Sequence, residues 1–226
     1  MSTSSPELKK QPSNNLVKDG GIVVELTNTG KRFNRDWIFR KLHYRFETKK
    51  SYAVTGPNGS GKSTLLQVIG GATNQSEGTV EYQISNSKSQ IHTEEIYNHI
   101  SIAAPYLEVI EEMTATEFLQ FHSAFKQLTH SIKEILDIIG LEKSANKQIR
   151  YYSSGMKQRV KLAQAIFTDT PILLLDEPCT NLDKTGYDLY HQLIENYCGN
   201  KLIIVSSNDE NEIDFCEERL SILDWK

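Results

Sequence analysis

The amino-acid sequence predicts an α/β protein built on a parallel sheet that helices cover on both faces. Two short apolar runs, residues 172–175 and 202–205, lie between segments with helical periodicity. Continuously apolar strands of this length are typical of parallel sheets buried on both faces. A glycine-rich stretch, residues 56–61, joins a further strand to a helix, a connection that such a sheet commonly contains.

The elements of the first half follow from short apolar or alternating runs bounded by glycine, proline and polar residues. We expect strands over residues 22–26, 43–46 and 51–55, a helix over 61–71, and strands over 79–84 and 100–104.

A mostly helical insert is expected over roughly residues 106–152. Thr114 with Glu117, and Ser131 with Glu134, have the spacing of capping boxes, in which two side chains satisfy backbone N–H groups at a helix start. Gly140 lies where a helix would end. Phe118, Phe121 and Phe125 follow the first box at helical spacing, and such a stripe is more often core than docking surface.

The last third of the chain returns to alternating helix and strand. The periodicity predicts helices over residues 154–168 and 183–197, each followed by one of the two apolar strands. Leu189, Tyr190, Leu193, Ile194 and Tyr197 share one face of the second helix.

Composition excludes several classes of protein. The chain has 226 residues, 24% of them charged, and a formal net charge of −4. Proteins dedicated to nucleic acid are usually basic, so we expect no nucleic-acid partner. No run approaches the ~18 apolar residues of a membrane span.

Residues 1–20 are polar and are expected to form a disordered leader, with one domain over residues 21–226.

The cysteines and histidines do not indicate a metal or disulfide framework. Cys179, Cys198 and Cys216 are odd in number and form no CxxC pair, which favours a reducing compartment. The histidines show no metal-ligand spacing.

The strongest chemical signal is a match to GxxxxGK[ST], the P-loop. Glycines allow a loop to wrap phosphates with its N–H groups, Lys62 supplies a positive charge, and the hydroxyl of Ser63 can ligate Mg²⁺. The match follows a strand and precedes a helix, as the motif requires. The residues expected to bind the nucleotide are Gly56, Pro57, Asn58, Gly59, Ser60, Gly61, Lys62, Ser63 and Thr64.

A second signal is the acidic pair that ends the strand at residues 172–175. Ligands bind beyond the carboxyl ends of parallel strands, so Asp176 is expected near the Mg²⁺ held by Ser63. Glu177 is one residue further and is expected to act as the base for an attacking water. Taken alone, an acidic pair after a strand is equally typical of a solvated loop.

A third signal is residues 151–159, YYSSGMKQR, where small hydroxyl residues open a helix. The functional interpretation is an anion site at a helix N-terminus, formed by Ser153, Ser154 and Gly155. The alternative is an ordinary serine N-cap.

The order of these motifs resembles that of the ATP-binding cassette (ABC) ATPases, over about residues 22–224. YSSGMKQ resembles the family's signature sequence, and residues 181–183 resemble its D-loop. The resemblance implies a P-loop NTPase (RecA-like) core with an N-terminal antiparallel β part and an inserted helical subdomain. It also implies ATP and Mg²⁺ as cofactors, and Phe33 as the aromatic residue that stacks on adenine; alternatively, Phe33 is a core or strand-edge residue.

The resemblance further implies a head-to-tail dimer, homomeric or heteromeric. Each ATP would lie between the P-loop of one domain and the signature of a second ABC domain. Loss of the γ-phosphate on hydrolysis would then free the two halves.

Two positions depart from the family pattern. Asn208 occupies the place of the switch histidine; it can donate a hydrogen bond to the γ-phosphate but cannot become cationic. Alternatively, Ser207 or Asn208 caps a helix that starts near Asp209. Pro105 stands where the family has a glutamine, so water or another residue such as Tyr106 would replace that ligand. We therefore expect hydrolysis that is slow or depends on a partner.

The leading functional hypothesis is the ATPase subunit of an ABC transporter. A separate transmembrane permease would dock on the insert near residues 118–126 and hold the protein at the cytoplasmic face of the inner membrane. Two alternatives remain open: a soluble ABC ATPase outside any transporter, and an ATP-gated dimerisation module with little hydrolysis, which Pro105 and Asn208 favour.

Overall fold

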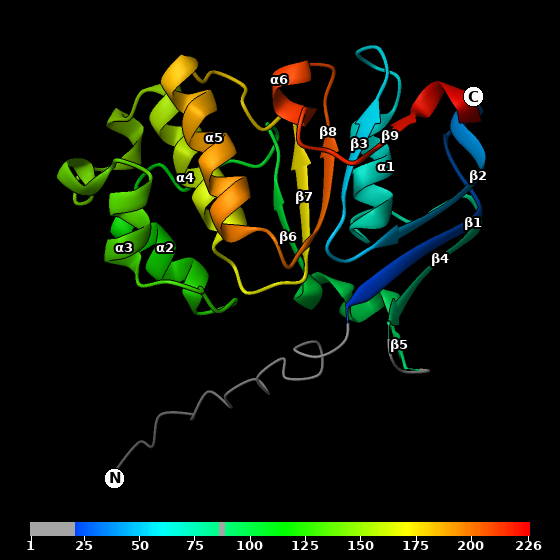
Figure 1. Cartoon of the computed structure of the whole chain (residues 1–226), viewed down its shortest axis with the longest axis horizontal. Coiled ribbons are helices and arrows are strands. Elements are labelled where there is room, and N and C mark those ends of the chain that lie inside the picture. Colours follow the sequence, from blue (N-terminus) through cyan, green and yellow to red (C-terminus); the bar gives the residue numbers. More distant parts are fainter. Residues whose placement is uncertain (1–20, 86–88) are drawn as a thin grey trace, which may run out of the picture.

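Residues 21–85 and 89–226 are described by a computed structural model, and the expected leader over residues 1–20 lies outside this part of the chain. The described residues form an antiparallel and a parallel sheet, with helices packed around the parallel one (Figure 1). The predicted α/β class with an N-terminal antiparallel part is confirmed.

The antiparallel sheet has the strand order β2-β1-β4-β5. Its strands are β1 (Ile22–Phe33), β2 (Asp36–Glu47), β4 (Glu77–Ile84) and β5 (Gln90–Ile91). The first two are much longer than the runs predicted at 22–26 and 43–46. Register shifts after Leu26 interrupt the alternation of apolar residues, and they bury the polar side chains of Thr29 and Lys31. Because those residues are polar, the sequence pattern hides the continuation of β1.

The parallel sheet has the order β6-β7-β8-β3-β9. Its strands are β3 (Ser51–Thr55), β6 (Ile100–Ala103), β7 (Ile172–Asp176), β8 (Leu202–Ser206) and β9 (Glu218–Ser221). The predicted strands at 51–55, 172–175 and 202–205 are confirmed. Strand β9 is not predicted, because an edge strand containing Glu218 and Arg219 lacks the apolar run of the buried strands.

The helices are α1 (Lys62–Ile69), α2 (Ala115–Ser123), α3 (Ile132–Ile138), α4 (Ser154–Ile166), α5 (Lys184–Tyr197) and α6 (Glu210–Ile213). Short 3-10 segments cover Thr93–His99, Glu142–Ser144, Ile149–Tyr151 and Ile222–Trp225. The elements between residues 106 and 152 are helical or 3-10, as expected; the division into subdomains stays a prediction.

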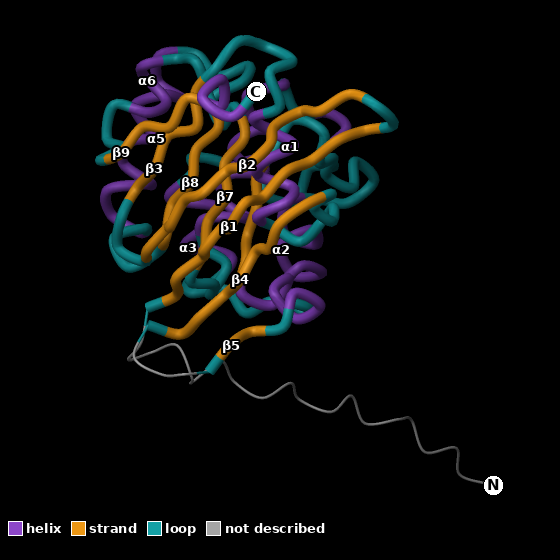
Figure 2. Tube along the Cα trace, turned by 90° about the vertical axis from the view of Figure 1, so that its right-hand side faces the viewer, coloured by secondary structure: helices purple, strands orange, loops and turns teal. Residues whose placement is uncertain are grey.

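Successive residues of the central strands face two different cores. Leu173 of β7 packs with α2, α3, α4 and α5, whereas Leu174 packs with α1 and the antiparallel sheet. Strand β8 alternates in the same way. Helices α1 and α4 therefore lie on opposite faces of the parallel sheet, and Figure 2 shows the long strands β1 and β2 running across one face.

Both capping boxes of the insert are present. The side chains of Thr114 and Ser131 accept the N3 backbone N–H, and Glu117 and Glu134 return the bond to the N-cap backbone. Gly140 follows α3 with φ of 68°, the left-handed conformation that closes a helix. The sequence therefore sets both helix starts correctly.

The aromatic stripe of the insert is core only at its first residue, so the expectation holds for Phe118 and fails for Phe121 and Phe125. Phe118 is buried, but Phe121 and Phe125 are 46% and 64% exposed. Ala115, Phe118 and Leu119 are the buried residues of α2, so Phe121 lies off the packed face. Phe125 lies beyond the end of α2 at Ser123. The ring centroids of the two exposed residues are 5.1 Å apart.

The three cysteines are free and buried. Burial raises the pKa of all three thiols, to about 12 for Cys198 and Cys216. Across residues 21–85 and 89–226, no cluster of potential metal-ligating His, Cys, Asp or Glu residues occurs. Nor does this part of the chain contain a helix with the length and apolar character needed to cross a bilayer.

The cap of α3 gives a test of the fold. Replacing Ser131 by Ala removes the acceptor for the Glu134 N–H, so we expect the free energy of unfolding to fall by about 1 kcal/mol in urea titrations. Lys133→Ala, an exposed change in the same helix, should alter it by less than ~0.5 kcal/mol. Equal stability of both variants would contradict the assigned cap.

Candidate functional site

The candidate site lies at the carboxyl edge of the parallel sheet. The P-loop follows β3, Asp176 ends β7 and Asn208 follows β8, and these three strands are neighbours in the sheet. Since parallel strands end at a common edge, the fold brings together residues that are up to 152 positions apart.

The P-loop leaves the start of α1 uncapped by any side chain. The N-cap is Gly61, and none of the described side chains bonds to the first turn. The first turn contains no acidic residue. A helix start with free N–H groups and no nearby carboxylate suits an anion such as phosphate.

Glycine is required in this loop for two physical reasons. Gly56, Gly59 and Gly61 have φ values of 142°, 76° and 104°, which side chains disfavour. A Cβ atom at Gly61 would overlap Cγ2 of Ile38, and one at Gly56 would lie 2.7 Å from Cγ2 of Ile222. Strand β2 and the last 3-10 segment thus press directly on the loop.

Lys62 lies inside the loop and is only 5% exposed. Its ammonium donates to the carbonyl of Gly56 at 2.7 Å and to that of Pro57 at 3.4 Å. The positive charge is therefore held against the loop backbone, where the motif predicts contact with the terminal phosphates.

Asp176 provides the test of whether Mg²⁺ fits. It is 2% exposed, and its Oδ1 has no hydrogen-bond partner within the described chain. Ser206, opposite Asp176 in the β7–β8 register, also has a buried hydroxyl without a described partner. Buried polar oxygens are normally satisfied, so an oxygen-binding cation fits here, with Ser63 at the first turn of α1 as the second predicted ligand.

Glu177 is exposed and adopts a strained backbone conformation. Its φ is 44°, unusual for a residue with a side chain. The strain is held by neighbours: its N–H donates to the carbonyl of Ser206 at 2.9 Å, and its carbonyl accepts the Thr180 hydroxyl at 2.8 Å. Such strain is typical of functional sites whose surroundings fix the backbone.

Two further side chains hold the loop that carries Glu177. The Gln158 amide donates to the carbonyl of Pro178 at 2.6 Å, and the Cys179 N–H donates to Glu212 Oε1 at 2.7 Å. The sequence interpretation gave no role to either residue. Gln158 belongs to the signature stretch and could have been noticed there, whereas Glu212 lies in an acidic segment that indicates only a solvated turn.

Asn208 contacts the P-loop directly. Its Oδ1 accepts the Gly56 N–H at 3.0 Å, and its Nδ2 donates to Asn58 Oδ1 at 3.5 Å. The alternative that Ser207 or Asn208 caps the next helix is wrong. Asp209 caps α6 by accepting the Asn211 N–H, because its carboxylate sits one residue before the helix start. The side chain of Asn208 is thus directed to the loop.

Pro105 follows β6, the strand beside β7. Its carbonyl accepts the Lys161 ammonium at 3.3 Å. Burial raises the pKa of the next residue, Tyr106, and the charge of Asp176 acts in the same direction. The Tyr106 hydroxyl, which the sequence suggests as a replacement ligand, is therefore near the acidic end of β7.

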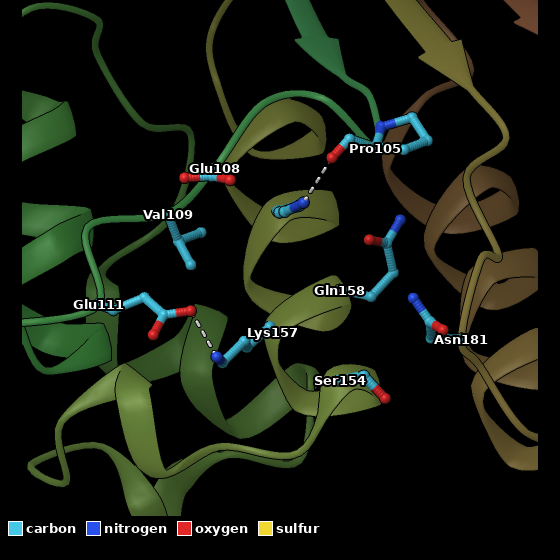
Figure 3. Close-up of a pocket in the computed structure, with 9 residues that line it drawn as sticks. Pro105, Glu108, Val109, Glu111, Ser154, Lys157, Gln158 and Asn181 are labelled. Atoms are coloured by element: carbon cyan, nitrogen blue, oxygen red, sulfur yellow. Dashed lines mark hydrogen bonds and ion pairs between the residues drawn. The ribbon is translucent and has the colours of Figure 1, made fainter.

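A cavity of about 240 Å³ lies between the chain after β6 and helix α4 (Figure 3). Lys161 spans it to Pro105, and Lys157 spans it to Glu111 at 2.5 Å. These two lysines tie the chain after β6 to the helix that carries the signature.

The signature residues form a separate site. Ser153 is the N-cap of α4 and accepts the Met156 N–H at 3.2 Å, so the ordinary capping interpretation holds. Ser153, Ser154 and Gly155 also line a cavity of about 440 Å³ beside Asn181 and Asp183, and no P-loop residue lines it. Within one chain, the structure does not bring the signature to the P-loop.

Phe33 is 49% exposed at the end of β1, and the Lys31 ammonium lies 5.0 Å from its ring centroid. It is not a core residue. Ile38 of the same hairpin packs on Gly61, so the hairpin borders the P-loop, but no described contact joins Phe33 to the loop.

A glycine-lined loop between the first parallel strand and a helix, with a carboxylate at the end of β7, two strands away in the same sheet, defines a P-loop nucleoside triphosphatase fold. Comparison with known proteins specifies the class further. The family model for ABC transporters matches residues 39–180, and the chain belongs to this family. ATP-binding domains of this family are ATPases.

The relatives agree with this assignment. YybJ, an uncharacterised ABC transporter ATP-binding protein of Bacillus subtilis, is 30% identical over 206 residues, covering 88% of this chain and 92% of its own length. For several other curated relatives, the chain covers only 26% to 67% of the relative's own length.

Solved structures show the same fold. An ABC transporter ATP-binding protein of Pyrococcus furiosus superposes with a TM-score of 0.76 at 19% identity, covering 90% of this chain and 99% of that one. The cassette MJ0796, dimeric and bound to ADP and phosphate, gives 0.71 at 25% identity, covering 88% and 93%.

The fit around Gly61 gives a test of the site. Gly61→Ala would place a methyl group into Ile38 at a left-handed position, so we expect the free energy of unfolding to fall by about 2 kcal/mol or more and ATP binding to weaken. Denaturant titration and nucleotide titration measure the two effects. Gly199→Ala, with open space around it among the described residues, is the control.

Proposed function

We propose that this protein is the ATP-binding and hydrolysing subunit of an ABC transporter that works with a separate membrane permease. Family membership supports the transporter assignment. The observation that supports the chemistry is that three features lie at one edge of the sheet. They are an uncapped glycine loop, the unpaired carboxylate oxygen of Asp176 and the exposed Glu177.

Each residue at this edge has one proposed task. Lys62 and the N–H groups of the P-loop bind the β- and γ-phosphates of ATP. Ser63 and Asp176 hold Mg²⁺, which neutralises phosphate charge when bound. Asn208, already bonded to Gly56, donates its amide hydrogen to the γ-phosphate.

Glu177 accepts a proton from the attacking water. A new bond forms between the water oxygen and the γ-phosphorus as the bond to the bridging oxygen breaks. The electron pair of that bond leaves with ADP, and phosphate is released. Phe33 is proposed to stack on the adenine, with the Lys31 ammonium beside its ring.

A second ABC domain is proposed to complete the site, as a homodimer or a heterodimer. Helices α1 and α4 lie on opposite faces of the sheet, and the signature does not reach the P-loop of its own chain. Ser153, Ser154 and Gly155 of another copy would close the open side of the γ-phosphate. The dimeric state of MJ0796 supports this arrangement.

The permease is proposed to contact the exposed aromatic pair Phe121 and Phe125 of the insert. Two large apolar side chains exposed together are typical of an interaction surface. Such a contact would hold the protein at the cytoplasmic face of the inner membrane.

A second candidate function is an ATP-gated dimerisation module with little hydrolysis. Pro105 offers no side-chain oxygen at the position after β6, and Asn208 cannot become cationic. Both features favour slow turnover, and phosphate release distinguishes the two functions.

Lys62 gives a test of nucleotide binding. Lys62→Ala removes a charge-assisted contact worth about 1.5–3 kcal/mol, so we expect ATP affinity to fall about tenfold to a hundredfold in a fluorescent-nucleotide titration. Lys143→Ala, an exposed change in the insert, should leave affinity unchanged. Unchanged affinity of the Lys62 variant would contradict the site.

Glu177 gives a test of hydrolysis. Glu177→Gln removes the proposed base, so we expect phosphate release to fall about a hundredfold or more while ATP binding is kept. Equal rates in both proteins would remove Glu177 as the base. If the wild-type chain binds ATP and dimerises but releases no phosphate, even with its permease, the dimerisation module is the correct function.

A further inference from the structure

Glu212 is a buried carboxylate to which the proposed reaction assigns no task. It lies in the short helix α6 and is 4% exposed. Burial raises its pKa, and the nearby charges of Asp209 and Glu177 act in the same direction. A buried acidic side chain is costly unless hydrogen bonds compensate for the lost water, so its partners indicate why it is there.

Its carboxylate faces two different loops. Oε1 accepts the Cys179 N–H at 2.7 Å, in the loop that carries Glu177. On the other side, the Ser207 hydroxyl lowers the pKa of the carboxyl and so opposes the effect of burial, and Ser207 directly precedes Asn208. The Ser207 oxygen in turn accepts the Asp209 N–H at 2.9 Å, which fixes its orientation. One side chain thus joins the loop after β7 to the loop after β8.

Both loops need such a connection for the proposed chemistry. Glu177 keeps a left-handed conformation only while its surroundings hold it. Asn208 is bonded to Gly56 of the P-loop, so its position is set by the nucleotide cradle. A series of neighbouring residues therefore connects that cradle with the loop of the proposed base. It runs from Gly56 through Asn208, Ser207 and Glu212 to Cys179.

Anchoring of α6 does not by itself require this carboxylate. The helix is capped by Asp209, and the Tyr187 hydroxyl bonds to that cap at 2.7 Å. The Tyr190 hydroxyl bonds to the backbone carbonyl of Glu212 at 3.0 Å, a contact that any residue at this position would keep. The side chain is therefore free for a role toward the two loops.

We propose that Glu212 is a positioning residue that holds the side chains of Glu177 and Asn208 in the correct place relative to the γ-phosphate. This inference rests on the proposed function, because it assigns the effect of Glu212 to the step that Glu177 performs. It predicts that loss of the carboxylate slows hydrolysis and leaves ATP binding in place.

The test compares Glu212→Ala, Glu212→Gln and Ser207→Ala in the full chain. We expect the alanine change at Glu212 to lower kcat at least tenfold, with KM and the affinity for ATP within twofold of wild type. Glutamine keeps an oxygen for the Cys179 N–H and should restore kcat to within threefold. Ser207→Ala breaks the other end of the connection, with little change of volume, and should lower kcat with unchanged affinity.

Glu210→Ala is the matched control, since Glu210 lies in the same helix and its carboxylate is exposed and paired with Arg219. It should behave as wild type. If Glu212→Ala is too unstable to purify, the Ser207 and glutamine variants decide the result.

Three outcomes would overturn the inference: unchanged kcat in Glu212→Ala and Ser207→Ala, a parallel loss of ATP affinity, or a glutamine variant as impaired as the alanine variant. Failure of the proposed function is distinguishable, because Glu177→Gln would then hydrolyse ATP as fast as wild type.

Discussion

A cradle built from backbone N–H groups requires a loop whose donors are left unpaired by the rest of the protein. Here packing sets the loop: Ile38 and Ile222 press on the positions of Gly61 and Gly56 so closely that no side chain fits. The apolar contacts come from strand β2 and the last 3-10 segment. They leave the start of α1 without a side-chain cap, although the Gly56 N–H already donates to Asn208. The antiparallel sheet therefore contributes to the site as well as to the core.

The site also requires that several strands of the parallel sheet end at one common edge. The register of β7 with β8 sets Asp176 beside Ser206, and β3 pairs with β8 on the other side. The loops beyond these strands then carry Glu177, Asn208 and the P-loop, the residues proposed to act on the γ-phosphate. Side chains such as Glu212 and Gln158 connect loops to one another or to α4, so the site depends on contacts between segments distant in sequence.

The sequence predicts those features that depend on local rules. The P-loop, the apolar strands and both capping boxes each need only residues within a few positions of one another, and all are confirmed. Features that depend on distant partners are missed: the shifted registers of β1, the exposure of Phe121, the cap at Asp209 and the burial of Glu212. A glutamate in an acidic stretch gives no sign of its environment until the fold supplies Cys179 and Ser207 as partners. The site roles themselves stay predictions.

The burial of all three thiols lowers their reactivity toward oxidants. Their raised pKa values leave almost no thiolate at neutral pH, and sulfur reacts mainly in that form. Cys179, in the loop of the proposed base, would react with peroxide or an alkylating reagent only after the surrounding core opens. Thiol modification of this protein therefore reports how often the folded chain opens, and the carboxyl edge of its parallel sheet presents no exposed thiol among the residues described.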